Sequence, residues 1–68
     1  QFDAIVMEFK VQNPAKEENL QETVQNALLQ IEEKNYDTEL LARGIPKLKI
    51  RHYGFAFCGK KVLIGTDK

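Results

Sequence analysis

The segment Glu8-Phe9-Lys10 holds the residues of this sequence whose types and spacing are best suited to chemistry. Residues two apart on a β-strand project from the same face, roughly 6.5–7 Å from one another. At that separation a carboxylate can hold a divalent cation while an ammonium group orients a water molecule or neutralises a phosphate. The same pattern is also common as an exposed charge pair on the solvent face of a strand, so the spacing alone leaves both interpretations open.

A second candidate, Gly54-x-x-x-x-Gly59-Lys60, matches most of a phosphate-binding loop. That loop needs a Ser or Thr next, to bind magnesium, and this chain has Lys61 there. Residues 55–58 and 62–64 also have the pattern of strands, where a phosphate loop would open a helix. We therefore expect no nucleotide site in this chain.

Two isolated residues of reactive type have no suitable partners in the sequence. His52 has no His, Cys or carboxylate at a metal-ligand spacing, so we expect a partly exposed strand histidine. Cys58 falls in a turn with no activating base nearby, and we expect a passive thiol.

The elements that must position Glu8 and Lys10 begin with a strand over residues 4–11. Its alternation separates two faces, with Ile5, Met7, Phe9 and Val11 on one and Ala4, Val6, Glu8 and Lys10 on the other. We expect the first set to form the core with the following helix, and Glu8 and Lys10 to lie on the opposite side of the sheet.

A helix is predicted to begin between residues 14 and 20, either at Asn13-Pro14 or at Asn19, which has Glu22 three residues later. At 100° per residue its apolar stripe comprises Leu20, Val24, Ala27, Leu28 and Ile31. Thr23, Gln30 and Lys34 follow one border of that stripe, and Leu29 points the opposite way.

The rest of the chain is predicted to form a short helix and two strands. Asn35 can end the first helix in a left-handed conformation, and Asp37 can cap a second helix that stops at Gly44. From Leu48 the period is two again, with a turn at residues 58–60. The predicted fold class is α/β, with a small mixed sheet in the order strand, helix, short helix, strand, strand. The strands on either side of the helices pair in parallel, and the last two form an antiparallel hairpin.

Length and composition restrict the class of protein. A chain of 68 residues has room for one small domain, and its ten basic and ten acidic side chains give no net charge, unlike a stand-alone nucleic-acid module. Residues 1–34 hold seven of the acidic side chains and residues 35–68 seven of the basic ones, which favours attraction between the halves. One cysteine, no apolar run of bilayer length and no signal-like start favour a cytoplasmic protein without membrane contact.

Several segments together resemble the PD-(D/E)XK nuclease superfamily. They are AIVMEFK at residues 4–10, QIEEKNY at 30–36, LLARGI at 40–45, YGFAF at 53–57 and GKKV at 59–62. The resemblance covers nearly the whole chain, and the order of these motifs is much more specific than one E-x-K. The most similar branch is bacterial, and in it the nuclease-like domain follows an AAA-type ATPase-like domain.

The resemblance implies a fold, an activity and roles for particular residues. The fold would be part of a restriction-endonuclease-like core, and the activity would be Mg²⁺-dependent hydrolysis of phosphodiester bonds in DNA or RNA. By this resemblance Glu8 is the metal carboxylate and Lys10 the catalytic lysine. Gln30 supports them as a further catalytic residue, with Tyr36 beside it toward the substrate.

The sequence departs from the superfamily in one respect. The first metal-binding Asp normally belongs to an earlier strand, and Asp3 lies an odd number of residues from Glu8, which sends it to the opposite face. The chain opens at Gln1 without Met, which suggests that it was cut from a longer protein. We expect residues 1–68 to be a single folded unit, the C-terminal fragment of a nuclease-like domain. Such a fragment is expected to be inactive alone and to pair with itself. A catalytically inactive nuclease fold, used for nucleic-acid or protein contact, is the alternative.

Overall fold

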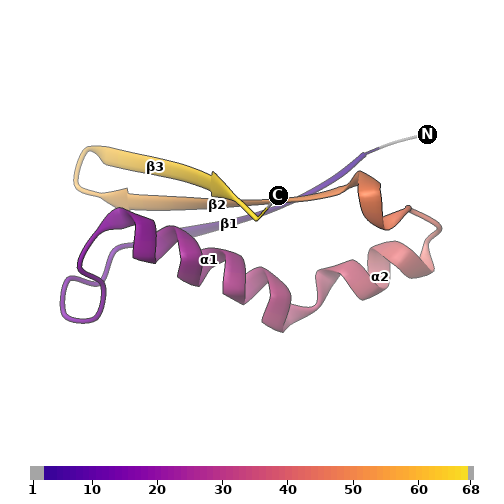
Figure 1. The fold of residues 1–68 in the computed structure, drawn as a ribbon, viewed down its shortest axis with the longest axis horizontal. Coiled ribbons are helices and arrows are strands. Elements are labelled where there is room, and N and C mark those ends of the chain that lie inside the picture. The colour runs from indigo at the N-terminus through magenta and orange to yellow at the C-terminus, as the bar shows by residue number, and fades with distance from the viewer. Residues whose placement is uncertain (1–2, 68) are drawn as a thin grey trace.

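The structure, a computed structural model, describes residues 3–67 and confirms the α/β class and the predicted order of elements. The elements are β1 (Ala4–Val11), α1 (Leu20–Lys34), α2 (Tyr36–Ala42), a 3₁₀ turn (Lys47–Lys49), β2 (Ile50–Cys58) and β3 (Lys61–Thr66). Both helices lie on one side of the sheet, and no element of the described residues covers the other side (Figure 1). Neither helix within residues 3–67 has the length and apolar character needed to cross a bilayer.

The sheet has the predicted mixed topology, with strand order β1-β2-β3. The strand β1 pairs with β2 in parallel, and β2 pairs with β3 in antiparallel orientation. Gly59 and Lys60 form the two-residue turn of the hairpin, and Gly59 adopts the left-handed conformation (φ 59°) that such turns require. Both outer strands, β1 and β3, therefore have one edge without a strand partner among the described residues.

Local capping signals set the limits of α1. The side-chain oxygen of Asn19 accepts a hydrogen bond from the Glu22 backbone N–H at 3.0 Å, and the Glu22 carboxylate accepts one from the Glu18 backbone N–H at 3.0 Å. The helix thus begins at the second of the two predicted start signals. It ends at Asn35, which has the predicted left-handed conformation (φ 57°).

The start of α2 differs from the prediction. The N-cap residue of α2 is Asn35, and the helix begins at Tyr36. Asp37 therefore lies inside the helix instead of capping it. The Asp37 carboxylate is instead hydrogen-bonded to His52. The strand β2 likewise begins at Ile50 instead of Leu48, because residues 47–49 form a 3₁₀ turn.

The core lies between α1 and the sheet, but the predicted face of β1 is wrong. The buried cluster comprises Val24, Leu28, Ile31 and Ala56, with the partly buried Val6, Leu20 and Leu63 packed against it. Ile5, Met7 and Phe9 are 58%, 50% and 58% exposed, on the side of the sheet away from α1. The face with Val6, Glu8 and Lys10 is turned toward the helix.

Small residues in β2 and β3 explain why α1 packs on this face. A Cβ atom added at Gly54 would lie 3.0 Å from the Val24 carbonyl oxygen, and one at Gly65 would lie 2.5 Å from Val24 Cγ1. The helix backbone thus approaches the sheet closely at Gly54, while the Val24 side chain fills the space over Gly65 and Ala56 is fully buried in the core. On the opposite face the larger side chains of Phe55 and Phe57 would hold a helix farther away, and no helix within residues 3–67 packs there.

Candidate active site

Glu8 and Lys10 project from β1 toward α1, on the same face as each other. This confirms the prediction from strand alternation that they share a face. The prediction that this face lies on the side of the sheet away from the helix is wrong. Glu8 pairs in register with Gly54, and Lys10 with Ala56. These small neighbours leave room above the sheet, and the two charged side chains lie half-buried beside the helix.

A lysine from α1 reaches the Glu8 carboxylate. Lys34 Nζ lies 3.6 Å from Glu8 Oε1, and the Glu8 side chain is only 18% exposed while that of Lys34 is 51% exposed. Lys34 is in the last turn of α1, where the helix dipole favours a cation. Because Lys34 remains half in water, the pair contributes little to stability. The ion pair places the Lys34 ammonium group next to Glu8, in addition to that of Lys10.

Lys10 lies within electrostatic range of a buried carboxylate, Glu17, in the loop before α1. Glu17 is 3% exposed and accepts hydrogen bonds from the Asn13 backbone N–H at 2.7 Å, from Asn26 Nδ2 at 2.6 Å and from Thr23 Oγ1 at 3.1 Å. The Asn13 and Asn26 bonds lower the pKa of Glu17 more than burial raises it, and the charge of Lys10 adds a smaller lowering. With both oxygens engaged, Glu17 anchors the loop next to Lys10.

Gln30 and Tyr36, the predicted supporting residues, flank Lys34 on the helical side of the site. Gln30 is half-buried on α1, one turn before Lys34, in agreement with its place on the border of the apolar stripe. Tyr36 is 40% exposed at the start of α2 and lines a shallow cavity of about 320 Å³ together with Val6 and Met7 of β1. The structure thus brings Tyr36 to the part of β1 that immediately precedes Glu8.

The described residues do not complete a metal site. Within residues 3–67 no three His, Cys, Asp or Glu side chains are grouped so as to hold a metal ion. Asp3 is not a second ligand, because its carboxylate pairs with Arg51 at 3.7 Å on the other face of the sheet, as strand parity requires. Glu8 is one carboxylate of the kind that binds Mg²⁺, and it has two lysines near it, so the chain by itself fits only part of such a site.

His52 forms a second polar cluster that the sequence reasoning missed. The residue is 7% exposed, and the expectation of a partly exposed histidine is wrong. His52 Nδ1 lies 2.6 Å from Asp67 Oδ2, and its Nε2 lies 2.7 Å from Asp37 Oδ1. Both carboxylates are fifteen residues away in sequence, beyond any local motif spacing. The cluster joins α2, β2 and the segment after β3.

The remaining sequence motifs have no catalytic geometry. Residues 54–60, which resemble a phosphate-binding loop, are strand and hairpin turn as expected. Cys58 is exposed and carries a free thiol. A larger groove of about 850 Å³ runs between the first half of α1 and β3, where Asn26 and Gln25 face Leu63 and Gly65, and it contains none of the predicted site residues.

Comparison with known proteins agrees with the motifs gathered around Glu8. The family model of the PD-(D/E)XK nuclease superfamily matches residues 2–67, nearly the whole chain. Comparisons with curated proteins and with solved structures gave no significant match. The extent of the family match shows that this chain belongs to the PD-(D/E)XK nuclease superfamily.

Proposed function

We propose that this chain supplies part of the active site of a nuclease that hydrolyses phosphodiester bonds in the full-length protein. The observation that carries the proposal is the common face of Glu8 and Lys10, directed toward α1, in a chain that matches the superfamily over residues 2–67. Superfamily membership alone gives the nuclease-like fold, so the residues must support the activity.

Each proposed residue has a role that its position allows. Glu8 is the carboxylate that would bind a divalent metal, and a further carboxylate would have to come from outside residues 3–67. The Lys10 ammonium group, held on the same face, orients the attacking water or neutralises a phosphate oxygen. Gln30 and Tyr36 bound the site from α1 and α2 and help to position the substrate.

The remaining parts of the proposal rest on the resemblance of the motifs. They are Mg²⁺ as the metal, DNA or RNA as the substrate, and an ATPase-like domain that precedes this one in a cytoplasmic bacterial protein. The match to the superfamily supports the divalent metal and the nucleic-acid substrate by analogy, whereas the ATPase-like domain and the bacterial, cytoplasmic setting rest on the motif resemblance alone.

A second candidate function is a nuclease fold that binds nucleic acid or protein without cleaving. Two observations favour it: Glu8 is the one carboxylate of the proposed set within residues 3–67, and Lys34 is already paired with it. In this alternative the lysines around Glu8 would contact phosphate groups and nothing would be hydrolysed.

Cleavage and binding by the full-length protein separate the two functions. The wild type should cut DNA or RNA with Mg²⁺ and not with chelator, and Lys10→Met should lower the cleavage rate by about 10²–10⁴-fold. Gln30→Ala should lower it by about tenfold, while binding of an uncut substrate in chelator changes little.

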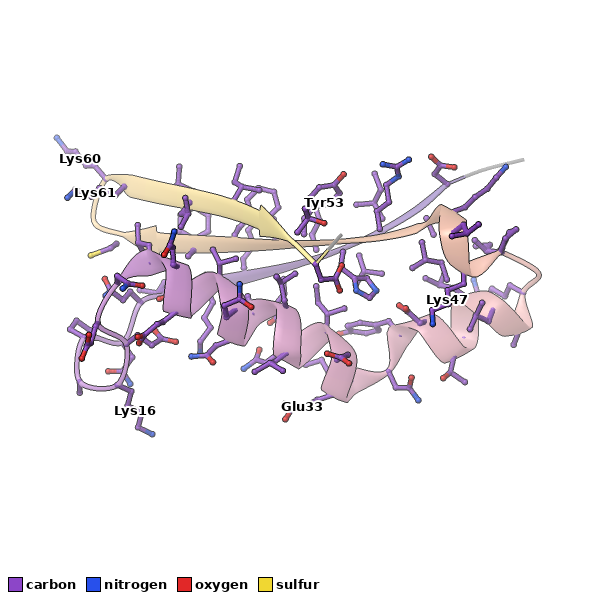
Figure 2. All side chains as sticks on the ribbon, in the orientation of Figure 1. Lys16, Glu33, Lys47, Tyr53, Lys60 and Lys61 are labelled. Carbon is purple, nitrogen blue, oxygen red and sulfur yellow. The ribbon has the colours of Figure 1, made fainter. Side chains whose placement is uncertain are left out.

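Lys16→Met is the matched control for Lys10→Met. Lys16 is an exposed lysine of the same chain in the loop before α1, and Figure 2 shows it pointing away from the sheet. It should leave the cleavage rate unchanged. Binding without cleavage by the wild type on either nucleic acid would favour the second function.

A further inference from the structure

The loop between β1 and α1 contains a buried carboxylate whose hydrogen-bond partners are all neutral. Glu17 is 3% exposed, and its side chain accepts hydrogen bonds from the Asn13 backbone N–H, the Thr23 hydroxyl and the Asn26 amide. The ion pairs seen within residues 3–67 all involve other carboxylates. Because a carboxylate that is almost fully buried is normally paired with a cation, this arrangement is unusual.

The neutral donors keep Glu17 ionised. The hydrogen bonds from Asn13 and Asn26 hold the pKa of Glu17 below its usual value of 4.5, although burial acts in the opposite direction. The side chain therefore carries a negative charge at neutral pH, in a place that water hardly reaches. Salt and water screen such a charge less than one on the surface, so it acts on cations that do not touch it.

Lys10 is a cation within range of this charge. It is half-buried on the face of β1 that is turned toward α1. Two residues later, the Gln12 backbone N–H donates to the Phe57 carbonyl oxygen at 2.8 Å, and the Gln12 side-chain amide donates to the Glu17 carbonyl oxygen at 2.9 Å. Strand alternation puts Lys10 and Gln12 on the same face, so Glu17 is tied to the strand directly beyond Lys10. In agreement, the charge of Lys10 contributes to the lowered pKa of Glu17.

Lys10 thus lies between two carboxylates, Glu8 before it in β1 and Glu17 beyond it. Glu8 and Lys10 share a face at a spacing of roughly 6.5–7 Å, which two flexible side chains can bridge. The Glu8 carboxylate nevertheless pairs with Lys34, at 3.6 Å, and within residues 3–67 the Lys10 side chain forms no hydrogen bond or ion pair. The attraction of Glu17 opposes that of Glu8, which accounts for the unpaired ammonium group of Lys10.

We propose that Glu17 is a positioning residue for Lys10, whose charge draws the ammonium group away from Glu8 and keeps it available to the substrate. This role rests on the proposed function, since it requires Lys10 to be the catalytic lysine and Glu8 the metal carboxylate. Without the charge of Glu17, Lys10 would turn toward Glu8. A lysine paired with Glu8 would no longer orient water, and it would compete with a divalent cation for that carboxylate.

Crystal structures of the full-length protein, grown without divalent metal, test where Lys10 lies. In the wild type we expect Lys10 Nζ to stay beyond ion-pair distance, about 4 Å, from the Glu8 carboxylate. In Glu17→Gln we expect an ion pair between Lys10 and Glu8. An unmoved Lys10 in Glu17→Gln would overturn the proposal. So would an ion pair between Lys10 and Glu8 in the wild type, and that result needs no variant to fold.

Steady-state cleavage by the same proteins with Mg²⁺ measures the consequence for the reaction. Glu17→Gln should lower kcat by about tenfold with KM nearly unchanged, because a misplaced ammonium group affects the reaction more than binding. Thr23→Val is the matched control: it removes the hydroxyl that donates to Glu17 Oε1 at 3.1 Å and loosens the loop, but it leaves the carboxylate charged. It should change neither kcat nor the position of Lys10.

The two measurements separate the role of Glu17 from the proposed function. A wild type that cleaves neither DNA nor RNA would contradict the proposed function, while the position of Lys10 in the crystals would still support or overturn the role of Glu17. Equal kcat values for the wild type and Glu17→Gln would overturn the positioning role and leave the proposed function intact. Equal losses of kcat in Thr23→Val and Glu17→Gln would assign Glu17 to loop structure alone and also overturn it.

Discussion

The buried His52 joins three segments of the fold, and we predict that its contribution to stability depends on pH. Asp67 and Asp37 accept hydrogen bonds from its two ring nitrogens at 2.6 and 2.7 Å. An ionised carboxylate only accepts, so both contacts can be hydrogen bonds at once only when both ring nitrogens carry a proton, and this geometry favours the imidazolium form of His52. Burial by itself lowers the pKa of His52, but the bonds to Asp37 and Asp67 and the charges of these residues outweigh it and raise the pKa above 6.5.

The sign of the pH effect follows from this raised pKa. A histidine whose pKa is higher in the folded than in the unfolded chain binds its proton more tightly when folded. The stabilisation is therefore complete below the unfolded value of 6.5 and is lost as the pH rises through the folded pKa.

The magnitude comes from two charge-assisted hydrogen bonds with partly exposed partners. Such bonds are worth about 1.5–3 kcal/mol each when buried. The side chains of Asp37 and Asp67 are 29% and 35% exposed, so water replaces part of the interaction when the histidine is changed. We expect His52→Gln to lower the free energy of unfolding by about 2 kcal/mol near pH 6, or roughly 10 °C in Tm for a domain of this size.

Urea unfolding of the wild type and His52→Gln, at one protein concentration, measures the effect near pH 6 and near pH 9. The difference between the two proteins should fall from about 2 kcal/mol to below about 1 kcal/mol at the higher pH. Arg43→Gln is the control, because it removes the exposed Arg43–Glu39 ion pair and should show no such pH dependence. An equal loss at both pH values, or no loss near pH 6, would refute the assignment of a charged ring between two carboxylates.

Three further substitutions test other parts of the structure. Glu17→Gln should loosen the loop before α1. Because the pKa of Glu17 is lowered from 4.5 in the folded chain, the contribution of Glu17 to stability should be present above pH 4.5 and be lost as the pH falls below it. Acid unfolding of the wild type and the variant measures this difference. Gly54→Ala should cost about 1–3 kcal/mol in thermal unfolding, because the new Cβ would lie 3.0 Å from the Val24 carbonyl oxygen. Asn35→Ala should cost about 1 kcal/mol in urea unfolding because φ is 57°, whereas Asn35→Gly should be nearly neutral.

Local signals in the sequence were sufficient to predict the elements. The Asn19 and Glu22 pair marked the start of α1, and Asn35 marked its end, because a cap is formed by residues a few positions apart. The hairpin at Gly59 and Lys60 followed from the same kind of information. The predicted cap of α2 was wrong because Asn35, in its left-handed conformation, is both the C-cap of α1 and the N-cap of α2.

The orientation of β1 required information from distant strands. Both faces of β1 begin with apolar residues, so alternation alone did not decide which one the helix would cover. The face that α1 covers is determined by small residues in the other strands, which allow the helix to pack closely: Gly54, Ala56 and Gly65. The sequence already placed Gly54 and Ala56 on one face of their strand. Their parallel register with Glu8 and Lys10, had it been known, would have put these charged residues on the face that the helix covers.

The site could be predicted only where its residues share an element. Strand parity put Glu8 and Lys10 on one face and Asp3 on the other. The pairing of Lys34 with Glu8 and the two partners of His52 come from residues that the fold brings together across at least fifteen positions, and no short motif contains that information.

The central claim, that Glu8 takes part in hydrolysis, is tested most directly by comparing Glu8→Gln with Glu33→Gln in the full-length protein. Glu33 is an exposed glutamate on α1 that Figure 2 shows pointing away from the sheet. With Mg²⁺, Glu8→Gln should lower the cleavage rate of DNA or RNA by at least about 10²-fold, while Glu33→Gln leaves it unchanged. Equal cleavage by both variants and the wild type would contradict a catalytic role for Glu8.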